Sequence, residues 1–123
     1  MTNTYRERWK DEPEEHDFPA AADYLSLQLP EHDAAAAVEA LRTAPTIHRK
    51  AKDLLRASRL DLLPSDDPEV AKDLKKVASG ERLSPVLLVR GSPLVVADGY
   101  HRICASYRID EDADIPCRLV DAP

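Results

Sequence analysis

Cysteine is scarce in this chain, and long apolar runs are missing. The two cysteines, Cys104 and Cys117, are too few for a disulfide framework or for a structural zinc site with four nitrogen or sulfur ligands. We therefore expect reduced thiols. No window approaches the run of about 18 apolar residues that a membrane-spanning helix needs, and Met1–Lys10 lacks the apolar core of a signal peptide. These absences predict a cytoplasmic protein without a membrane segment.

An excess of positive charge is also missing. The chain has 17 Lys and Arg residues against 23 Asp and Glu residues, which gives a formal net charge of −6. This balance argues against a general polyanion-binding surface, so contact with nucleic acid would have to be local. The high charge of residues 1–18 around a lone Trp9 predicts a mobile arm that orders only in its last few residues. The length of the remaining segment, residues 19–123, predicts one domain.

Residues 19–59 are expected to form a helical extension of this domain. Ala20–Leu29 is ambiguous, because its alanines favour a helix while its leucines also fit the alternation of a strand; a helix is preferred. Ala34–Thr43 is a second helix by composition. Ile47–Ser58 is predicted as a third, with an apolar stripe on one side. Its other side, here called the basic segment, carries His48, Arg49, Lys50, Lys52 and Arg56, with Arg59 just beyond.

Residues 60–120 are expected to form the core of the domain. Leu60–Leu63 is predicted as a short strand. Asp66 or Asp67 then caps a helix that starts at Pro68 and ends near Ser79, with Gly80 in a left-handed conformation after it. The elements that follow are a hairpin of Pro85–Val89 and Leu94–Val96, a helix over Gly99–Arg108, and a closing strand Ile115–Val120 that begins at a sheet edge because of Pro116.

The polar residues where the second hairpin strand passes into the Gly99–Arg108 helix are the best candidates for chemistry. A helix N-terminus presents free N–H groups and a positive dipole end, which suits an anion. Tyr100 and Cys104 fall on the apolar side of this helix, which leaves His101 and Arg102 free to face the turn. Arginine offers a planar fork of donors to a phosphate, and histidine donates a hydrogen bond or carries charge near neutral pH.

Asp98 admits three interpretations. As a helix cap, the favoured one, it would add negative charge where a phosphate should lie. A Mg²⁺ ion between Asp98 and the phosphates would resolve that conflict. Asp98 is also a weak candidate for the base of a phosphotransferase.

The order of elements over Leu60–Val120 resembles the superfamily of the ParB N-terminal domain and sulfiredoxin. The segment Gly99-Tyr100-His101-Arg102 stands where sulfiredoxin has Gly-Cys-His-Arg, where ParB has a basic quartet and where a related free-serine kinase has Asp-Gly-His-Thr-Arg. The resemblance implies an α/β (α+β) fold with a small mixed sheet and flanking helices. It also implies that Asp98, Gly99, His101 and Arg102 hold the phosphates of a nucleotide such as ATP, CTP or ADP, and that Lys72 of the Asp-Pro helix is a further candidate. Apart from the resemblance, Arg49, Lys50 and Lys52 of the basic segment are candidates for additional contacts.

Departures from that superfamily restrict the function. Tyr100 replaces the catalytic cysteine of sulfiredoxin, so sulfinic acid reduction is not expected. We expect no helix-turn-helix domain of the ParB type after Val120. The triplet Gly80-Glu81-Arg82 is similar to the start of the ParB quartet, but it precedes a strand instead of following one and is therefore set aside.

Two functions follow. The first is a nucleotide- or phosphate-binding domain, with Mg²⁺-dependent phosphoryl transfer or hydrolysis as its reaction if it is an enzyme. The second is a non-catalytic adaptor for DNA or protein that uses the basic segment and Trp9. Open space lined by His101 and Arg102 would favour the first. Burial of these two side chains in salt bridges, for example of Arg102 with the acidic residues 110–114, would weigh against it. The sequence leaves the oligomeric state open, a homodimer included.

Overall fold

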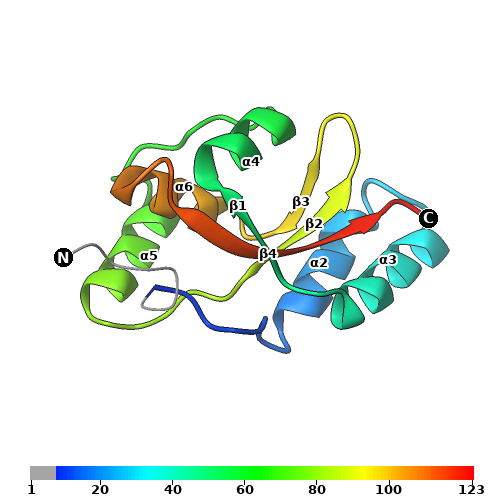
Figure 1. The fold of residues 1–123 in the computed structure, drawn as a ribbon. Coiled ribbons are helices and arrows are strands. Elements are labelled where there is room, and N and C mark those ends of the chain that lie inside the picture. Colours follow the sequence, from blue (N-terminus) through cyan, green and yellow to red (C-terminus); the bar gives the residue numbers. More distant parts are fainter. Residues whose placement is uncertain (1–7) are drawn as a thin grey trace.

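The computed structural model describes residues 8–123 and has a mixed α/β fold (Figure 1). The predicted fold class is confirmed. Residues 1–7 of the predicted arm lie outside the described residues. Within the described part, the helices are α2 (Asp17–Leu25), α3 (Glu31–Thr43), α4 (Ala51–Ser58), α5 (Pro68–Ala78) and α6 (Tyr100–Ile109), and the strands are β1 (Ile47–Lys50), β2 (Val86–Arg90), β3 (Val95–Asp98) and β4 (Asp114–Asp121).

The strands form one mixed sheet in the order β1-β4-β2-β3. β2 and β3 pair antiparallel, as the predicted hairpin requires, whereas β4 runs parallel to β2 and antiparallel to β1. The closing strand is therefore central, but its pairing with β2 starts only at Cys117, so Asp114–Pro116 pair with β1 alone. The prediction that this strand begins at a sheet edge is confirmed for these first residues. Pro116 lies opposite His48 of β1, a strand that the sequence analysis had assigned to a helix.

Helices cover both faces of the sheet (Figure 1). Alternate side chains of β2 point to opposite faces. Val86 and Leu88 belong to an apolar cluster with residues of α4, α5 and α6. Leu87 and Val89 belong to a second cluster, with residues of α2 and α3. All four side chains are buried, as expected for a central strand covered on both faces.

Trp9 is part of the first cluster, with 1% of its surface exposed. The backbone on either side of Trp9 pairs with Leu83, which lies shortly before β2. The Leu83 N–H donates to the Arg8 carbonyl and the Lys10 N–H donates to the Leu83 carbonyl, both at 2.7 Å. Burial of a large aromatic side chain favours this docking strongly. The expectation that Trp9 belongs to an arm ordered only in its last few residues is wrong.

The predicted helix Ile47–Ser58 is divided. Its first four residues form β1, and only Ala51–Ser58 are helical. The residue before α4, Lys50, is extended, and the N–H groups of Ala51 and Lys52 donate to the carbonyls of Ala113 and Glu111. The expected helical extension over residues 19–59 thus contributes a strand to the sheet.

Leu60–Leu63 is not a strand. Arg59 turns the chain with a φ of +59°, and side chains of α6 then bind the backbone that follows. The Tyr100 hydroxyl donates to the Asp61 carbonyl at 2.6 Å, and the Arg108 guanidinium donates to the Leu63 carbonyl. These contacts fix an irregular segment across the helix.

The remaining helices agree closely with the sequence. Asp67 caps α5, where its Oδ2 accepts the N–H groups of Glu69 and Val70, each at 3.1 Å. Gly80 follows with a φ of +88°. α3 and α6 lie where they were predicted. α2 spans Asp17–Leu25, so it begins earlier and ends earlier than the expected helix Ala20–Leu29.

Candidate functional site: a polar cavity before helix α6

Gly99 makes the turn from β3 into α6. Its φ is +113°, and a Cβ at this position would lie 2.4 Å from Val86 Cγ1, so only glycine fits. Gly99 is itself the N-cap, and no side chain among the described residues caps the helix. The prediction that Asp98 caps α6 is wrong, because its carboxylate is directed to Arg102 instead. The first N–H groups of α6 are left without a capping side chain.

A cavity of about 330 Å³ opens before this helix N-terminus, and we call it the Gly99 cavity. It is lined by Asp98, Gly99, Tyr100, His101 and Arg102, and by residues of the N-terminal segment, of α5 and of the segment before β2: Glu14, His16, Asp17, Glu69, Lys72, Asp73, Lys76, Arg82, Leu83 and Ser84. The structure therefore brings together Asp98, Gly99, His101, Arg102 and Lys72 as predicted. Lys50 lies elsewhere, 3.9 Å from Asp112.

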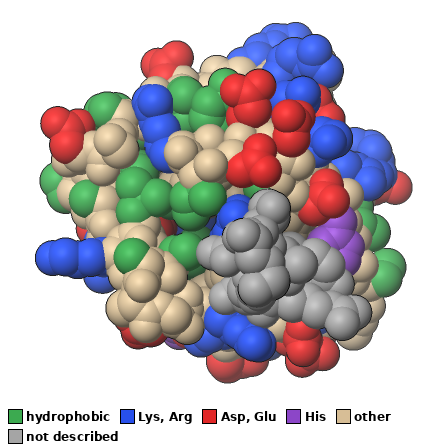
Figure 2. Space-filling view, turned by 60° about the vertical axis from the view of Figure 1, so that its left-hand side comes forward, with side chains coloured by type: hydrophobic (Ala, Val, Ile, Leu, Met, Phe, Trp, Pro, Cys, Tyr) green, Lys and Arg blue, Asp and Glu red, His purple; other side chains and the backbone are tan. Residues whose placement is uncertain are grey.

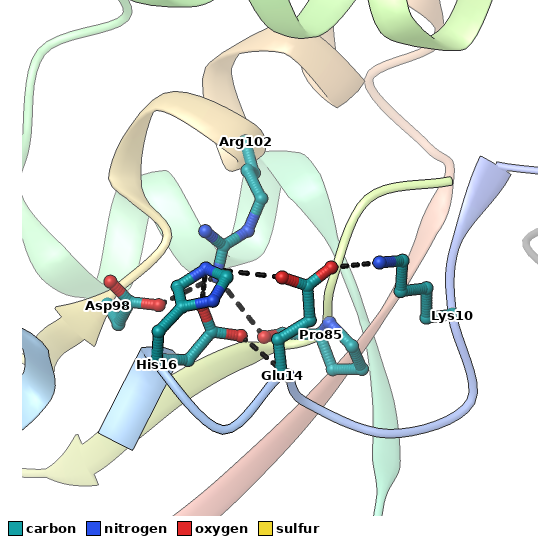
Figure 3. A network of polar contacts seen from close by, with 7 residues as sticks. Lys10, Glu14, His16, Pro85, Asp98 and Arg102 are labelled. Atoms are coloured by element: carbon teal, nitrogen blue, oxygen red, sulfur yellow. Dashed lines mark hydrogen bonds and ion pairs between the residues drawn. The ribbon is translucent and has the colours of Figure 1, made fainter. Parts of the chain in front are cut away.

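The Arg102 guanidinium already binds two acceptors within the protein. Its Nη2 lies 2.9 Å from Asp98 Oδ2 and donates to the Pro85 carbonyl at 3.3 Å, while its Nε has no hydrogen-bond partner in the part of the chain that the structure describes. Figure 3 shows the guanidinium extending from α6 toward Asp98 and Pro85. Arg102 does not pair with the acidic residues 110–114, but its largely buried guanidinium forms an ion pair with Asp98. Burial in a salt bridge is the observation that was expected to weigh against a site, and for Arg102 it is met. Arg102 is therefore less available to a ligand than expected.

The N-terminal segment forms one wall of the cavity. His16 Nε2 lies 3.2 Å from Glu14 Oε2 and 3.4 Å from Asp17 Oδ1. Lys10 pairs with Glu14, and the Glu14 N–H donates to Asp17 Oδ2. Figure 3 shows His16 and Glu14 on the N-terminal segment, and both line the same cavity as Arg102. Sequence reasoning missed these residues, and the lone Trp9, which docks the segment, is the signal that could have pointed to them.

Burial raises the pKa of two carboxyl groups that line the cavity. It raises the pKa of Asp98, and nearby Asp17 raises it further, whereas Arg102 acts in the opposite direction. Burial also raises the pKa of Asp73, against Arg102 and Lys76. Desolvation thus disfavours the charged forms of two acids in the cavity.

Basic side chains of the cavity are available for an anion. Within residues 8–123, neither Lys72, Lys76 nor Arg82 forms an ion pair within 4.0 Å. Arg82 belongs to the Gly80-Glu81-Arg82 triplet that was set aside. It reaches the cavity because the segment before β2 passes beside the start of α6. Its position in the sequence therefore did not indicate that Arg82 lines this cavity.

The basic segment does not form one helical face. His48, Arg49 and Lys50 belong to β1, and Lys52 and Arg56 belong to α4. Lys52 lies 2.6 Å from Asp112, and Arg56 lies 3.4 Å from Asp53. Figure 2 shows Lys and Arg side chains next to Asp and Glu side chains on one face of the molecule. Opposite charges thus lie close together, in keeping with the acidic composition.

Neither cysteine has the surroundings of a reactive thiol. Cys104 and Cys117 are both free and buried. Burial raises the pKa of Cys104 and brings that of Cys117 to about 11, which makes them poor nucleophiles.

Among the described residues, no group of three His, Cys, Asp or Glu side chains could hold a metal ion. Asp98, bound to Arg102, does not fit the role of a lone Mg²⁺ ligand.

Comparison with known proteins gives no match: no family model fits the chain, and neither a curated protein nor a solved structure is significantly similar to it. Within the described residues, no helix has both the length and the apolar character needed to cross a bilayer. The function is therefore argued from the residues of the site.

Proposed function

We propose that this protein binds the phosphate groups of a nucleotide, or of another phosphorylated small molecule, in the Gly99 cavity. The observation that carries the proposal is the uncapped N-terminus of α6, which opens into a cavity with basic side chains from three other positions. Free N–H groups and the helix dipole attract an anion. Lys72, Lys76 and Arg82 add positive charge that no acidic side chain of the described residues neutralises by direct pairing.

The arrangement of elements adds support to this proposal. A capped helix, a hairpin, a Gly-Tyr-His-Arg helix and a closing strand follow one another as α5, β2, β3, α6 and β4. This is the order on which the resemblance to the ParB N-terminal domain and sulfiredoxin rests. The irregular Leu60–Leu63 segment departs from it.

A reaction can be assigned only by class. Phosphoryl transfer or hydrolysis is the reaction that such a site would serve, and Asp98 is its candidate base, with a pKa that burial raises above the usual value of an aspartate. The ion pair with Arg102 opposes that role, since it stabilises the carboxylate. Binding is thus the stronger part of the proposal.

Isothermal titration with ATP, CTP and ADP, each with and without Mg²⁺, tests the proposal. We expect binding to the wild type, and we expect Lys72→Ala to weaken it about tenfold because a charge-assisted contact is lost. Lys50→Ala is the matched control, because this lysine pairs with Asp112 outside the cavity, and it should leave affinity unchanged. Absence of binding at millimolar ligand would refute the proposal.

The adaptor hypothesis stays a prediction without a specific observation in its favour. Its basic residues are divided between β1 and α4, and two of them pair with Asp112. Trp9 is buried in the core and is not available to a partner.

A further inference from the structure

A second cavity, also of about 330 Å³, lies beside the first and has a different character. We call it the Tyr24 cavity. Its walls include Tyr24 of α2, Leu60 of the irregular segment and the end of β3, and it shares Asp98, Gly99, Tyr100 and His101 with the Gly99 cavity. The same turn therefore borders both spaces.

Aromatic and aliphatic side chains dominate the part of the Tyr24 cavity that is not shared. Tyr24 is 41% exposed and Leu60 is 37% exposed, although both are large apolar residues. They come from elements far apart in the sequence and meet at one cavity. The rings of Tyr100 and His101, with centroids 5.3 Å apart, contribute a further aromatic border. Walls of this kind suit a flat heterocycle, which stacks on aromatic side chains.

The two cavities together suggest a ligand with two chemically different ends. A phosphate at the start of α6 lies at the boundary between them, with basic side chains on one side and aromatic side chains on the other. Inorganic phosphate or polyphosphate would use only the first cavity. A nucleotide would use both.

We propose that the Tyr24 cavity receives the base of a nucleotide whose phosphates occupy the Gly99 cavity. This inference rests on the proposed phosphate-binding function and names the class of ligand: a nucleoside phosphate, held at its base by Tyr24 and Leu60. Stacking tolerates every base, so the cavity confers a preference for nucleotides over polyphosphates without selecting one base strictly.

Titration of the full chain with ATP and with inorganic tripolyphosphate tests the inference, because tripolyphosphate has the three phosphates and no base. We expect ATP to bind at least about fivefold more tightly, a low value for base stacking on an aromatic side chain. Tyr24→Ala and, separately, Leu60→Ala should reduce this preference while leaving tripolyphosphate affinity unchanged. Leu27→Ala is the matched control, since Leu27 is 85% exposed and lines neither cavity.

The outcomes separate the two proposals. Equal affinity of the wild type for ATP and tripolyphosphate overturns the base site and leaves phosphate binding intact. A preference for ATP that survives both Tyr24→Ala and Leu60→Ala also overturns it, because the base then lies elsewhere. Failure of both compounds to bind refutes the phosphate site and the base site together. Far-ultraviolet circular dichroism of each variant verifies that it is folded, and both substituted residues are exposed enough to tolerate alanine.

Discussion

Replacement of Gly99 by alanine should destabilise this fold by about 2–5 kcal/mol, and the structure divides that cost into two parts. A φ of +113° is unfavourable for any residue with a Cβ, at about 1–2 kcal/mol. In addition, the new Cβ would lie 2.4 Å from Val86 Cγ1 and 2.9 Å from Val86 Cβ. Overpacking of this kind typically costs about 1–3 kcal/mol.

Gly80 provides the control for the first part. Its φ is +88°, yet a Cβ there would meet no atom within 4 Å, so Gly80→Ala should cost only the backbone term, about 1–2 kcal/mol. Urea denaturation followed by fluorescence measures both variants, because Trp9 is the only tryptophan and is buried. The difference between the two free energies of unfolding isolates the contact with Val86.

A double-mutant cycle with Val86→Ala provides the second check. This change removes Cγ1, the nearer of the two clashing atoms, so Gly99→Ala should cost at least about 1 kcal/mol less in the Val86→Ala background. The reasoning is refuted if Gly99→Ala costs no more than Gly80→Ala, or if its cost is the same in both backgrounds. In either case, Gly99 would not be required by the packing of β3 and α6 against β2.

Three further substitutions test the packing, the helix cap and the buried thiol. Trp9→Ala should cost about 3–5 kcal/mol in urea denaturation followed by circular dichroism, and a value near zero would contradict the docking of the N-terminal segment. Asp67→Ala should cost about 1 kcal/mol through loss of the α5 cap, whereas Asp66→Ala, the control, should cost almost nothing. Folding raises the pKa of Cys117 from 9.0 to about 11, so its contribution is complete below pH 9 and is lost as the pH rises through 11. Wild-type stability should therefore fall by roughly 2–3 kcal/mol more than that of Cys117→Ala over this interval; parallel pH profiles would contradict the assignment.

Local signals in the sequence were sufficient to predict the helix and the hairpin that precede α6. Asp67 and Pro68 mark the start of α5 by backbone chemistry that needs no distant partner. The β-branched runs around Gly91 likewise specify a hairpin. The left-handed conformation was predicted for Gly80 alone, whereas the positive φ of Gly99 and the close approach of Val86 appear only in the structure.

Elements that depend on distant contacts could not be predicted in this way. β1 has the sequence Ile47-His48-Arg49-Lys50, which lacks strand alternation, and it is a strand because it pairs with β4. Trp9 is buried because Leu83 and the first core cluster lie beside it. The lining of the Gly99 cavity also depends on distant contacts, because the tertiary fold alone brings Lys76, Arg82 and Asp17 to the start of α6.

The charge distribution in the Gly99 cavity changes which residues are expected to hold a phosphate. Sequence reasoning favoured Arg102, yet this guanidinium pairs with the half-buried Asp98 and also binds the Pro85 carbonyl. A buried carboxylate without a partner is costly, so the pairing has a structural reason of its own. It also offsets the negative charge closest to α6, which would otherwise repel an anion. In the proposed function, Arg102 therefore acts mainly by neutralising Asp98, while the α6 N–H groups, Lys72, Lys76 and Arg82 contact the ligand. These three basic side chains have no ion-pair partner among residues 8–123. The lysine variants, more than any change at Arg102, are the informative test of phosphate binding.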